Sequence, residues 1–418
     1  MTQLLPHPGD GRPVELAGEP IGEDDAEAYI SGICFKTGPP GRVGVELEWL
    51  VQDRADPTRR VPHDLVTAAA AAAVVRYGTL SVEPGGQLEY SSVPGASLDA
   101  CIEATREDVA ALRAAVGGAG VRLAGHGVDP YRSPQRVLDA PRYAAMEEFF
   151  DRDSPAGRWM MGCTASVQLC LDAGTEAGST GYERRWHLAH AVGPVLVAAF
   201  ANSPIVGGRA TGWRSTRQAV WARVDPSRAG PVRRPDGSRP RSEWSRYALD
   251  ARVLCVRRAP GQPWTAEPGL TFRRWIHGAG DRRPTRDDLD YHLTTLFPPV
   301  RPRGYLELRM VDAQRDDGWV VPLAVVTALL DDVAAGDAAL AAVARLGAGA
   351  WSRAARHGLA DRGLAAAARA CFAAALDALP RLGVSAPVRA AVAAFAERYV
   401  HRGRCPADDL LVDVPGDR

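Results

Sequence analysis

The chain has 418 residues, of which 50 are basic and 50 are acidic, so its formal net charge is zero. No overall field would draw it to nucleic acid or to an anionic membrane, and we expect neither as a partner. Lys36 is the one lysine, and it does not belong to a Gly-Lys-Ser/Thr sequence, which excludes a Walker-type phosphate loop. We interpret Lys36 as a surface residue.

The cysteines and the apolar stretches indicate a cytoplasmic, soluble protein. The seven cysteines are widely spaced and include no CxxC pair, which favours free thiols in a reducing compartment. The polar start of the chain lacks the basic and apolar regions of a signal peptide. The longest apolar stretch, near 192–201, contains Gly193 and Pro194 and is too short to span a bilayer.

Hydrophobic periodicity predicts helices and strands that alternate after a disordered lead at 1–20. In chain order, we expect a helix over 24–33, a strand over 43–52, a helix over 64–77, a strand–turn–strand unit over 80–91, a helix over 98–119, strands over 121–124 and 160–171, a helix over 183–201, a long loop over 223–246, strands over 252–256 and 305–310, and alanine-rich helices over 322–400.

This order predicts an α+β fold, with helices on one side of a mainly antiparallel sheet. No composition shift marks a domain boundary, so we expect a single catalytic domain over 21–400. Its part at 321–400 would be helical, and 401–418 would be a tail.

The first candidate site is a pair of glutamates on the strand over 43–52. Glu46 and Glu48 alternate with aliphatic residues, so both side chains point to one face. Two buried carboxylates this close would repel each other unless a cation lay between them, and hard divalent cations prefer oxygen ligands. Taken alone, this pair favours the alternative, an edge strand with two solvated glutamates.

Glu83 and Glu89 flank the Pro84-Gly85-Gly86 turn, which brings two more carboxylates close together. The glycines would let the backbone approach a ligand closely. An ordinary surface turn is the alternative.

Two further strands carry polar side chains on one face. Glu307 and Arg309 project together, as suits a site that holds both a cation and a phosphate, although a simple ion pair fits too. Thr164 and Gln168 lie with Ser166 on one face of the strand over 160–171, where they line either a pocket or solvent.

In their order along the chain, these segments resemble the glutamate–cysteine ligases of the plant and bacterial type. The resemblance covers about 25–320 and is carried by the sequences at 43–48, 83–89, 161–168, 202–204, 213–215 and 305–309. The sequence at 127–132 and the preference for arginine over lysine resemble the actinobacterial branch, which supplies γ-glutamylcysteine for ergothioneine biosynthesis.

The resemblance implies a funnel-like, curved antiparallel sheet related to the glutamine synthetase catalytic core. It implies an ATP- and Mg²⁺-dependent ligase that phosphorylates the γ-carboxylate of glutamate, so that the amine of cysteine can attack the γ-glutamyl phosphate. Its small-molecule partners would be glutamate, cysteine and ATP, with two or more Mg²⁺ ions. We expect a monomer or a weak homo-oligomer.

Carried over by position, the family's metal-binding residues are Glu46, Glu48, Glu83, Glu89 and Glu307. Arg309 matches the residue that contacts the transferring phosphate, and with Glu307 it would form the catalytic pair. Gln168, Thr164 and Arg214 are the expected substrate-binding residues. The alternatives are a ligase of the same fold that uses another amine, a non-catalytic relative that binds nucleotide or amino acid, and a phosphotransferase.

Overall fold

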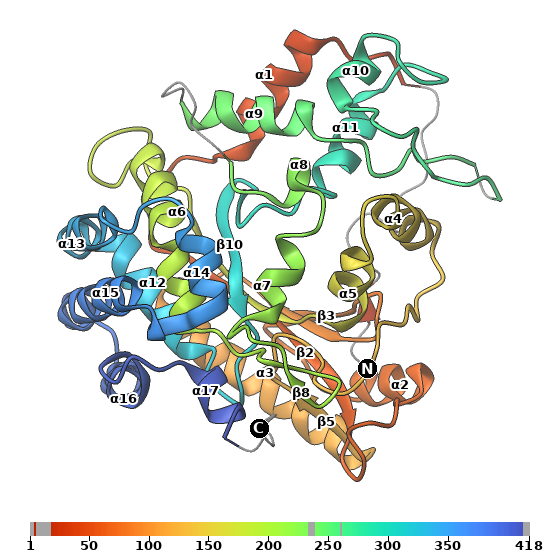
Figure 1. Ribbon diagram of the computed structural model, residues 1–418. Helices are drawn as coiled ribbons and strands as arrows, with labels where there is room; N and C mark the ends of the chain where they lie inside the picture. The colour runs from red at the N-terminus through yellow and green to blue at the C-terminus, as the bar shows by residue number, and fades with distance from the viewer. Residues whose placement is uncertain (1–3, 6–17, 233–238, 260, 413–418) are drawn as a thin grey trace.

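An open, mainly antiparallel β-sheet lies at the centre of the molecule (Figure 1). The computed structural model describes residues 4–5, 18–232, 239–259 and 261–412. In spatial order, the sheet contains β1 (Leu4–Leu5), β3 (Gly78–Val82), β4 (Leu88–Ser92), β2 (Val43–Asp53), β6 (Ser166–Asp172), β10 (Tyr305–Asp312) and β9 (Val300–Pro302). β5 (Val121–Ala124) pairs with the end of β2, and β7 (Ile205–Val206) forms a separate hairpin with β8 (Arg209–Ala210).

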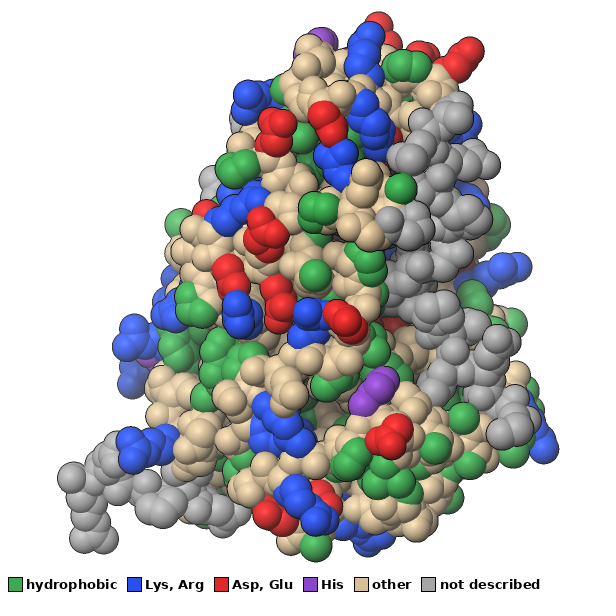
Figure 2. All heavy atoms as spheres, turned by 90° about the vertical axis from the view of Figure 1, so that its right-hand side faces the viewer, with side chains coloured by type: hydrophobic (Ala, Val, Ile, Leu, Met, Phe, Trp, Pro, Cys, Tyr) green, Lys and Arg blue, Asp and Glu red, His purple; other side chains and the backbone are tan. Residues whose placement is uncertain are grey.

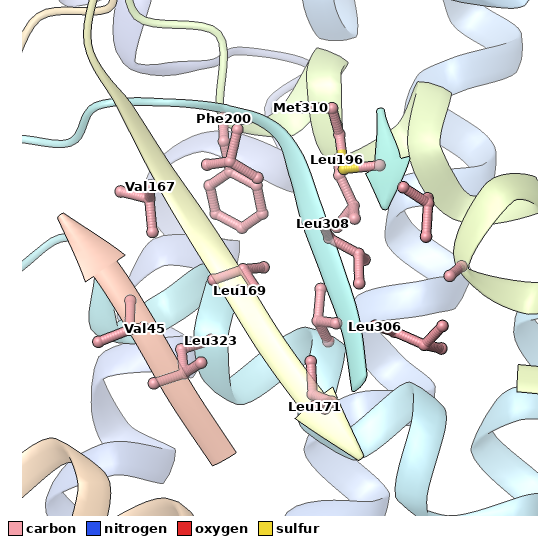
Figure 3. Close-up of a cluster of buried hydrophobic side chains, with 14 of the residues drawn as sticks. Val45, Val167, Leu169, Leu171, Leu196, Phe200, Leu306, Leu308, Met310 and Leu323 are labelled. Atoms are coloured by element: carbon pink, nitrogen blue, oxygen red, sulfur yellow. The ribbon is translucent and has the colours of Figure 1, made fainter. Parts of the chain in front are cut away.

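Strand alternation gives the sheet one aliphatic and one polar face. Val45, Val167, Leu169, Leu306 and Leu308 are each at most 1% exposed. They form a buried cluster with side chains that include those of Leu196, Phe200 and Leu323 (Figure 3). Full burial of one such side chain contributes about 1.5–3 kcal/mol, so this face fixes β2, β6 and β10 relative to one another. The side chains between them point to the opposite face.

Helices cover the aliphatic face. α3 (Leu98–Gly118), α6 (Tyr182–Ala199) and α12 (Val320–Asp331) contact β2, β10 and β6, respectively. The helical layer continues through α13 (Val333–Val343), α14 (Ala350–His357), η1 (Gly358–Ala360), α15 (Arg362–Arg381), α16 (Ala386–Phe395), η2 (Ala396–Val400) and α17 (Pro406–Leu410). By length and composition alone, α15 could cross a membrane; half of it is buried in the protein, where it packs against α12 and α13.

A second group of helices lies in the upper part of Figure 1. It contains α1 (Glu23–Cys34), α8 (Pro226–Ala229), α9 (Pro240–Asp250), α10 (Phe272–Ile276) and α11 (Arg286–Leu293). α4 (Pro141–Asp151) and α5 (Ala156–Cys163) flank the sheet, and α7 (Thr216–Trp221) leads up to α8. α2 (His63–Ala71) contacts α3 and β1.

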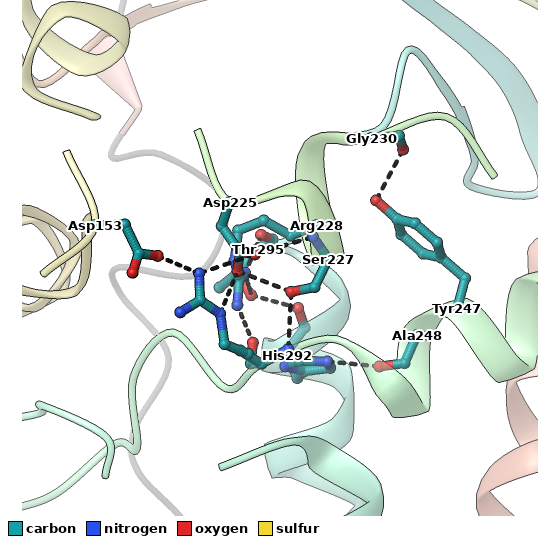
Figure 4. Close-up of polar contacts among 10 residues, drawn as sticks. Asp153, Asp225, Ser227, Arg228, Gly230, Tyr247, Ala248, His292 and Thr295 are labelled. Carbon is teal, nitrogen blue, oxygen red and sulfur yellow. Dashed lines mark hydrogen bonds and ion pairs between the residues drawn. The ribbon is translucent and has the colours of Figure 1, made fainter. Parts of the chain in front are cut away.

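A buried arginine fixes α8 to its neighbours (Figure 4). Arg228 is fully buried and donates to the Thr295 carbonyl oxygen at 2.6 Å and to Asp225 at 3.3 Å. Asp225 also accepts from Arg252 at 3.2 Å. A buried charge is stable only when it is paired and hydrogen-bonded, and here both conditions hold.

The α+β prediction is confirmed in its coarser form, as a mainly antiparallel sheet with helices. The strand expected over 160–171 is wrong in its first part, because residues up to Cys163 belong to α5, where Met160 and Met161 pack against α4. The helix expected over 64–77 ends at Ala71, since the Arg76 and Tyr77 N–H groups donate to Asp108, each at 2.7 Å.

Three further expectations are corrected. The loop expected over 223–246 contains α8 and the start of α9, while 233–238 lie outside the described residues. Residues 252–256 form only isolated bridges, Arg252 to Thr271 and Cys255 to Thr265, in place of a strand. Within the expected lead, Leu4–Leu5 pair with β3 and Pro20 pairs with Thr285; 1–3 and 6–17 are outside the described residues.

Candidate active site

A cavity of about 170 Å³ opens on the polar face of the sheet. It is lined by Glu46, Glu48, Glu83 and Glu89, and we call it the acidic cavity. Strand register brings these residues together, because Glu48 lies opposite Glu89 in the β2–β4 pair. In the β2–β6 pair, Glu46 lies opposite Gln168, which also lines the cavity.

Glu83 reaches the cavity from the turn between β3 and β4. Its backbone N–H donates to the Gln87 carbonyl oxygen at 2.9 Å, which closes the turn. A Cβ on Gly85 would lie 2.5 Å from the backbone of Gly162 in α5. The glycine therefore permits close contact with α5, whereas the sequence suggested contact with a ligand.

Crowding and burial raise the pKa values of three of the cavity's carboxyl groups. Burial, reinforced by Glu307, raises the pKa of Glu46 to about 7. Burial, reinforced by Glu48, raises the pKa of Glu83 to about 8. The pKa of Glu89 is raised well above its ordinary value by burial and by Glu46. Without a cation, the cavity therefore favours protonated carboxyl groups near neutral pH.

The four carboxylates fit a divalent cation. Glu83 Oε1 is buried and has no hydrogen-bond partner in the described part of the chain. A bound cation would satisfy this oxygen and would favour ionisation of the other carboxyl groups. The Cys170 sulfur and carboxylate oxygens of Glu46 and Glu307 also lie within 4.8 Å of one another.

Glu307 differs from the other four glutamates because arginines surround it. Arg301 donates to its two oxygens at 2.6 and 3.0 Å, Arg309 donates at 3.0 Å and Arg303 at 3.4 Å. Burial alone would raise the pKa of Glu307, but the three guanidinium groups outweigh burial and lower it. Glu307 is fully buried beneath arginines that themselves line the cavity.

Gln168 connects the acidic and basic parts of the site. Its Nε2 donates to Glu48 Oε1 at 2.8 Å, and its Oε1 accepts a hydrogen bond from Arg309. The Ser166 N–H donates to the other Glu48 oxygen at 2.9 Å. These bonds fix both Glu48 and Arg309 relative to the strand β6.

The two other expected substrate-binding residues occupy different places. Thr164 lines the acidic cavity from just beyond the end of α5, and its hydroxyl donates to the Met160 carbonyl oxygen at 2.6 Å. Arg214 lies outside the cavity and donates to Asp408 at 2.7 Å, so it attaches α17 to the rest of the protein.

Sequence reasoning missed four arginines that line the acidic cavity: Arg142, Arg217, Arg301 and Arg303. Arg301 lies opposite Glu307 in the short β9–β10 hairpin. The Arg-Pro-Arg-Gly sequence before β10 could have indicated this hairpin, since Gly304 has the positive φ that a tight turn requires. Arg217 is placed by its bond to the Arg309 carbonyl oxygen at 2.9 Å.

The family model and the similar sequences agree on one protein family. A model described as glutamate–cysteine ligase family 2 matches residues 42–415. The chain is 43% identical over 393 residues to glutamate–cysteine ligase EgtA of Mycobacterium tuberculosis. The aligned region covers 92% of this chain and 89% of that protein. The EgtA of Mycolicibacterium smegmatis is also 43% identical, over 93% of this chain and 90% of that protein.

A more distant sequence relative and one solved structure are also similar to the chain. The chloroplastic glutamate–cysteine ligase of Nicotiana tabacum is 29% identical over 71% of this chain and 60% of that protein. The crystal structure of glutamate–cysteine ligase from Francisella tularensis in complex with AMP superposes with a TM-score of 0.54 at 11% identity, over 90% of this chain and 85% of that one.

Proposed function

Because the chain belongs to glutamate–cysteine ligase family 2, we propose that it forms γ-glutamylcysteine from L-glutamate and L-cysteine with consumption of ATP. The observation that carries this proposal is the 43% identity to a named glutamate–cysteine ligase over 92% of the chain. The similarity to two EgtA proteins supports a role in ergothioneine biosynthesis.

The residues of the site suit an acyl phosphate mechanism. A carboxylate is a poor electrophile, and phosphorylation of the glutamate γ-carboxylate by ATP supplies a leaving group. The cysteine amine then attacks the acyl carbon, the new C–N bond forms and inorganic phosphate leaves. The phosphoryl group in transfer is negatively charged, so cationic groups fixed in advance stabilise it best.

Arg309 is the side chain that we propose to contact the transferring phosphoryl group. It lines the cavity, and its Nε is buried without a hydrogen-bond partner among the described residues, which leaves a donor for a ligand. Glu307 and Gln168 hold its guanidinium in place. Glu307 therefore acts by positioning arginines.

Glu46, Glu48, Glu83 and Glu89 would hold Mg²⁺, which neutralises charge on the phosphates when bound. We propose two or more ions, because the four carboxylates of one cavity carry more negative charge than a single ion offsets. The acidic cavity would form the centre of a funnel-shaped active site on the curved sheet.

The remaining expectations become proposals about the whole protein. One hydrophobic cluster extends from Ile21 to Val400, which supports a single catalytic domain over 21–400. One face of the molecule carries interspersed basic and acidic side chains (Figure 2). This mixture suits a protein whose substrates are small molecules and whose partners include neither nucleic acid nor a membrane. We propose that the protein is cytoplasmic and is a monomer or a weak homo-oligomer.

The function is tested with purified protein, Mg-ATP and glutamate, to which cysteine or a panel of other amines is added. We expect ADP release that requires both amino acids, and a product with the mass of γ-glutamylcysteine. ADP release that depends on a different amine would assign another ligase activity. ATP binding without product under every amine would contradict the proposal.

A further inference from the structure

A second polar cavity lies away from the acidic cavity. It is lined by residues of β5, the β7–β8 hairpin, α17 and the segment between β10 and α12, in the lower part of Figure 1. Its volume of about 510 Å³ is within the range of small-molecule sites. We call it the Asn202 cavity, after a buried residue in its wall. Among the described residues, none lines both this cavity and the acidic cavity, so each can hold its own ligand.

The side chain of Asn202 carries an unused hydrogen-bond acceptor. Asn202 is 1% exposed, and its Nδ2 donates to the carbonyl oxygens of Gly125 and Ala313 at 2.7 and 2.8 Å. Because both partners can only accept, the orientation of the amide is fixed. The remaining atom, Oδ1, is buried and has no hydrogen-bond partner within the described ranges. An unpaired buried acceptor is unfavourable, so a ligand that brings an N–H group to Asn202 would satisfy it.

Charges of both signs line the Asn202 cavity, through Arg122, Arg315 and Asp316. Arg122 donates to Gln52 Oε1 at 2.6 Å. In the part of the chain that the structure describes, the side chains of Arg315 and Asp316 form no ion pair. The pKa of His126, which also lines the cavity, is lowered to about 4 by burial and by Arg315 and Arg122. This imidazole is therefore neutral at neutral pH, and the described side chains around the cavity carry two positive charges and one negative charge.

The cavity also has an apolar wall, which includes Leu123, Tyr131, Ile205 and Leu410. Tyr131 is 44% exposed, so its ring offers surface to a ligand. An amino acid zwitterion with an apolar side chain matches the three parts of this cavity. Its carboxylate suits the two guanidinium groups, its ammonium group suits Asp316 and Asn202 Oδ1, and its side chain suits the apolar wall.

Asp312 connects the Asn202 cavity to the acidic cavity. The Asn202 N–H donates to Asp312 Oδ2 at 2.9 Å, and Asp312 Oδ1 lies 3.9 Å from Arg217 Nη1. Arg217 lines the acidic cavity and is 2% exposed. Its Nε and Nη1 have no hydrogen-bond partner among the described residues, and its Nη2 donates to the Arg309 carbonyl oxygen at 2.9 Å. Hydrogen bonding therefore leaves this guanidinium able to follow a displacement of Asp312.

We propose that the Asn202 cavity binds an amino acid zwitterion with an apolar side chain, and that this ligand changes the affinity of the acidic cavity for glutamate through Asp312. The effect on glutamate rests on the proposed ligase function, whereas binding of the zwitterion does not. Because linkage is reciprocal, glutamate must change the affinity for the zwitterion by the same factor. The Asn202 cavity is then a regulatory site, separate from the place where the substrates react.

The first test is calorimetric titration of the purified protein with L-phenylalanine, L-leucine and two analogues of phenylalanine. Phenethylamine lacks the carboxylate, and 3-phenylpropionate lacks the ammonium group. We expect the Kd of each analogue to exceed that of L-phenylalanine by about tenfold or more, as for the loss of one charge-assisted contact. An analogue that binds as tightly as L-phenylalanine would overturn the inference. So would the absence of binding by both amino acids at millimolar concentrations.

Substitutions locate the bound amino acid. Arg315→Gln and Asp316→Asn each remove one charge from the cavity wall at an exposed position, and each should raise the Kd of L-phenylalanine by about tenfold. Asp316 has a φ of 50°, which asparagine also tolerates, so Asp316→Asn should keep the backbone conformation. Arg369→Gln, which removes one charge from an exposed position on α15, is the matched control and should bind like the wild type. An unchanged Kd in both cavity variants would contradict the proposed location.

Titrations in the presence of glutamate separate coupling from competition. With increasing glutamate, the Kd of L-phenylalanine should change by about fivefold or more and then reach a plateau. Saturating L-phenylalanine should change the Kd of glutamate by the same factor. A Kd of L-phenylalanine that rises in proportion to glutamate without a plateau would place this ligand in the acidic cavity and overturn the inference. A Kd that glutamate leaves unchanged would overturn it as well.

Failure of this inference differs from failure of the proposed function. If the wild type makes γ-glutamylcysteine while neither amino acid binds in the Asn202 cavity, the ligase stands and the inference is wrong. If L-phenylalanine binds with the expected dependence on Arg315 and Asp316 but no amine yields product, the assignment of the cavity stands and the ligase proposal is wrong.

Discussion

Replacing Glu83 by glutamine removes one charge from the acidic cavity and keeps the shape of the side chain. In the folded protein without metal, the pKa of Glu83 is about 8 in place of an ordinary value of 4.5. The folded state therefore binds more protons than the unfolded state between these two values, so stability must fall as the pH rises through this window. If Glu83 titrated alone, the free energy of unfolding above pH 8 would be lower by about 5 kcal/mol than at acidic pH. Each unit of difference between the folded and unfolded pKa values contributes about 1.4 kcal/mol. Because Glu46 and Glu48 take part in the same repulsion, we expect the free energy of unfolding to fall by about 2–5 kcal/mol across this window.

The assay is urea unfolding at pH 5, 6, 7 and 8 in the presence of a metal chelator. The wild type should lose stability from pH 5 to pH 8, and Glu83→Gln should lose less. The two proteins should be similar at pH 5, and the variant should be the more stable one at pH 8. Added Mg²⁺ should stabilise the wild type at pH 8 by about 3 kcal/mol at 100 times its Kd. A wild-type stability that is constant or rises between pH 5 and pH 8 without metal would refute the reasoning.

Three further substitutions separate the roles of neighbouring residues. Glu46→Gln should reduce kcat/KM for glutamate by about a thousandfold, measured by ADP release. Its Tm should not fall, because the substitution removes one charge from a crowded anionic site. Full activity would show that Glu46 does not belong to the proposed cation site. Glu307→Gln should be inactive and also less stable by about 3–5 kcal/mol in urea unfolding, because Arg301, Arg303 and Arg309 lose their shared counter-charge; unchanged stability would contradict that role. Arg214→Ala should keep the KM of glutamate within twofold while the loss of its partly exposed ion pair with Asp408 costs up to about 1 kcal/mol; a large rise in KM would return Arg214 to the substrate site.

Strand alternation was enough to bring most of the site together from the sequence. The polar face carries Glu46, Glu48, Glu89 and Arg309, because residues i and i+2 of a strand project to one side. Pairing of the strands then places these side chains around one cavity. Glu83 followed from the short turn that joins two paired strands.

The arginines around Glu307 could not be found in the same way. Arg301 belongs to a strand of three residues, too short for alternation to show, and its role depends on register with β10. Thr164 was expected on a strand but lies at the end of α5, because packing of Met160 and Met161 against α4 overrides the local alternation. Arg214 and Arg217 are three residues apart, and only the three-dimensional path of the chain decides which one faces the cavity.

The contact between Gly85 and Gly162 has a mechanical consequence. The two backbones touch without side chains between them, so the turn that carries Glu83 cannot shift without displacing α5. Met160 and Met161 of the same helix line the acidic cavity, so a substrate bound against them would contact the helix on which the Glu83 turn rests. Occupancy of that wall and affinity for the cation would then be thermodynamically linked, each changing the other by the same factor. A two-glycine contact would thus serve as a rigid coupling between substrate and metal.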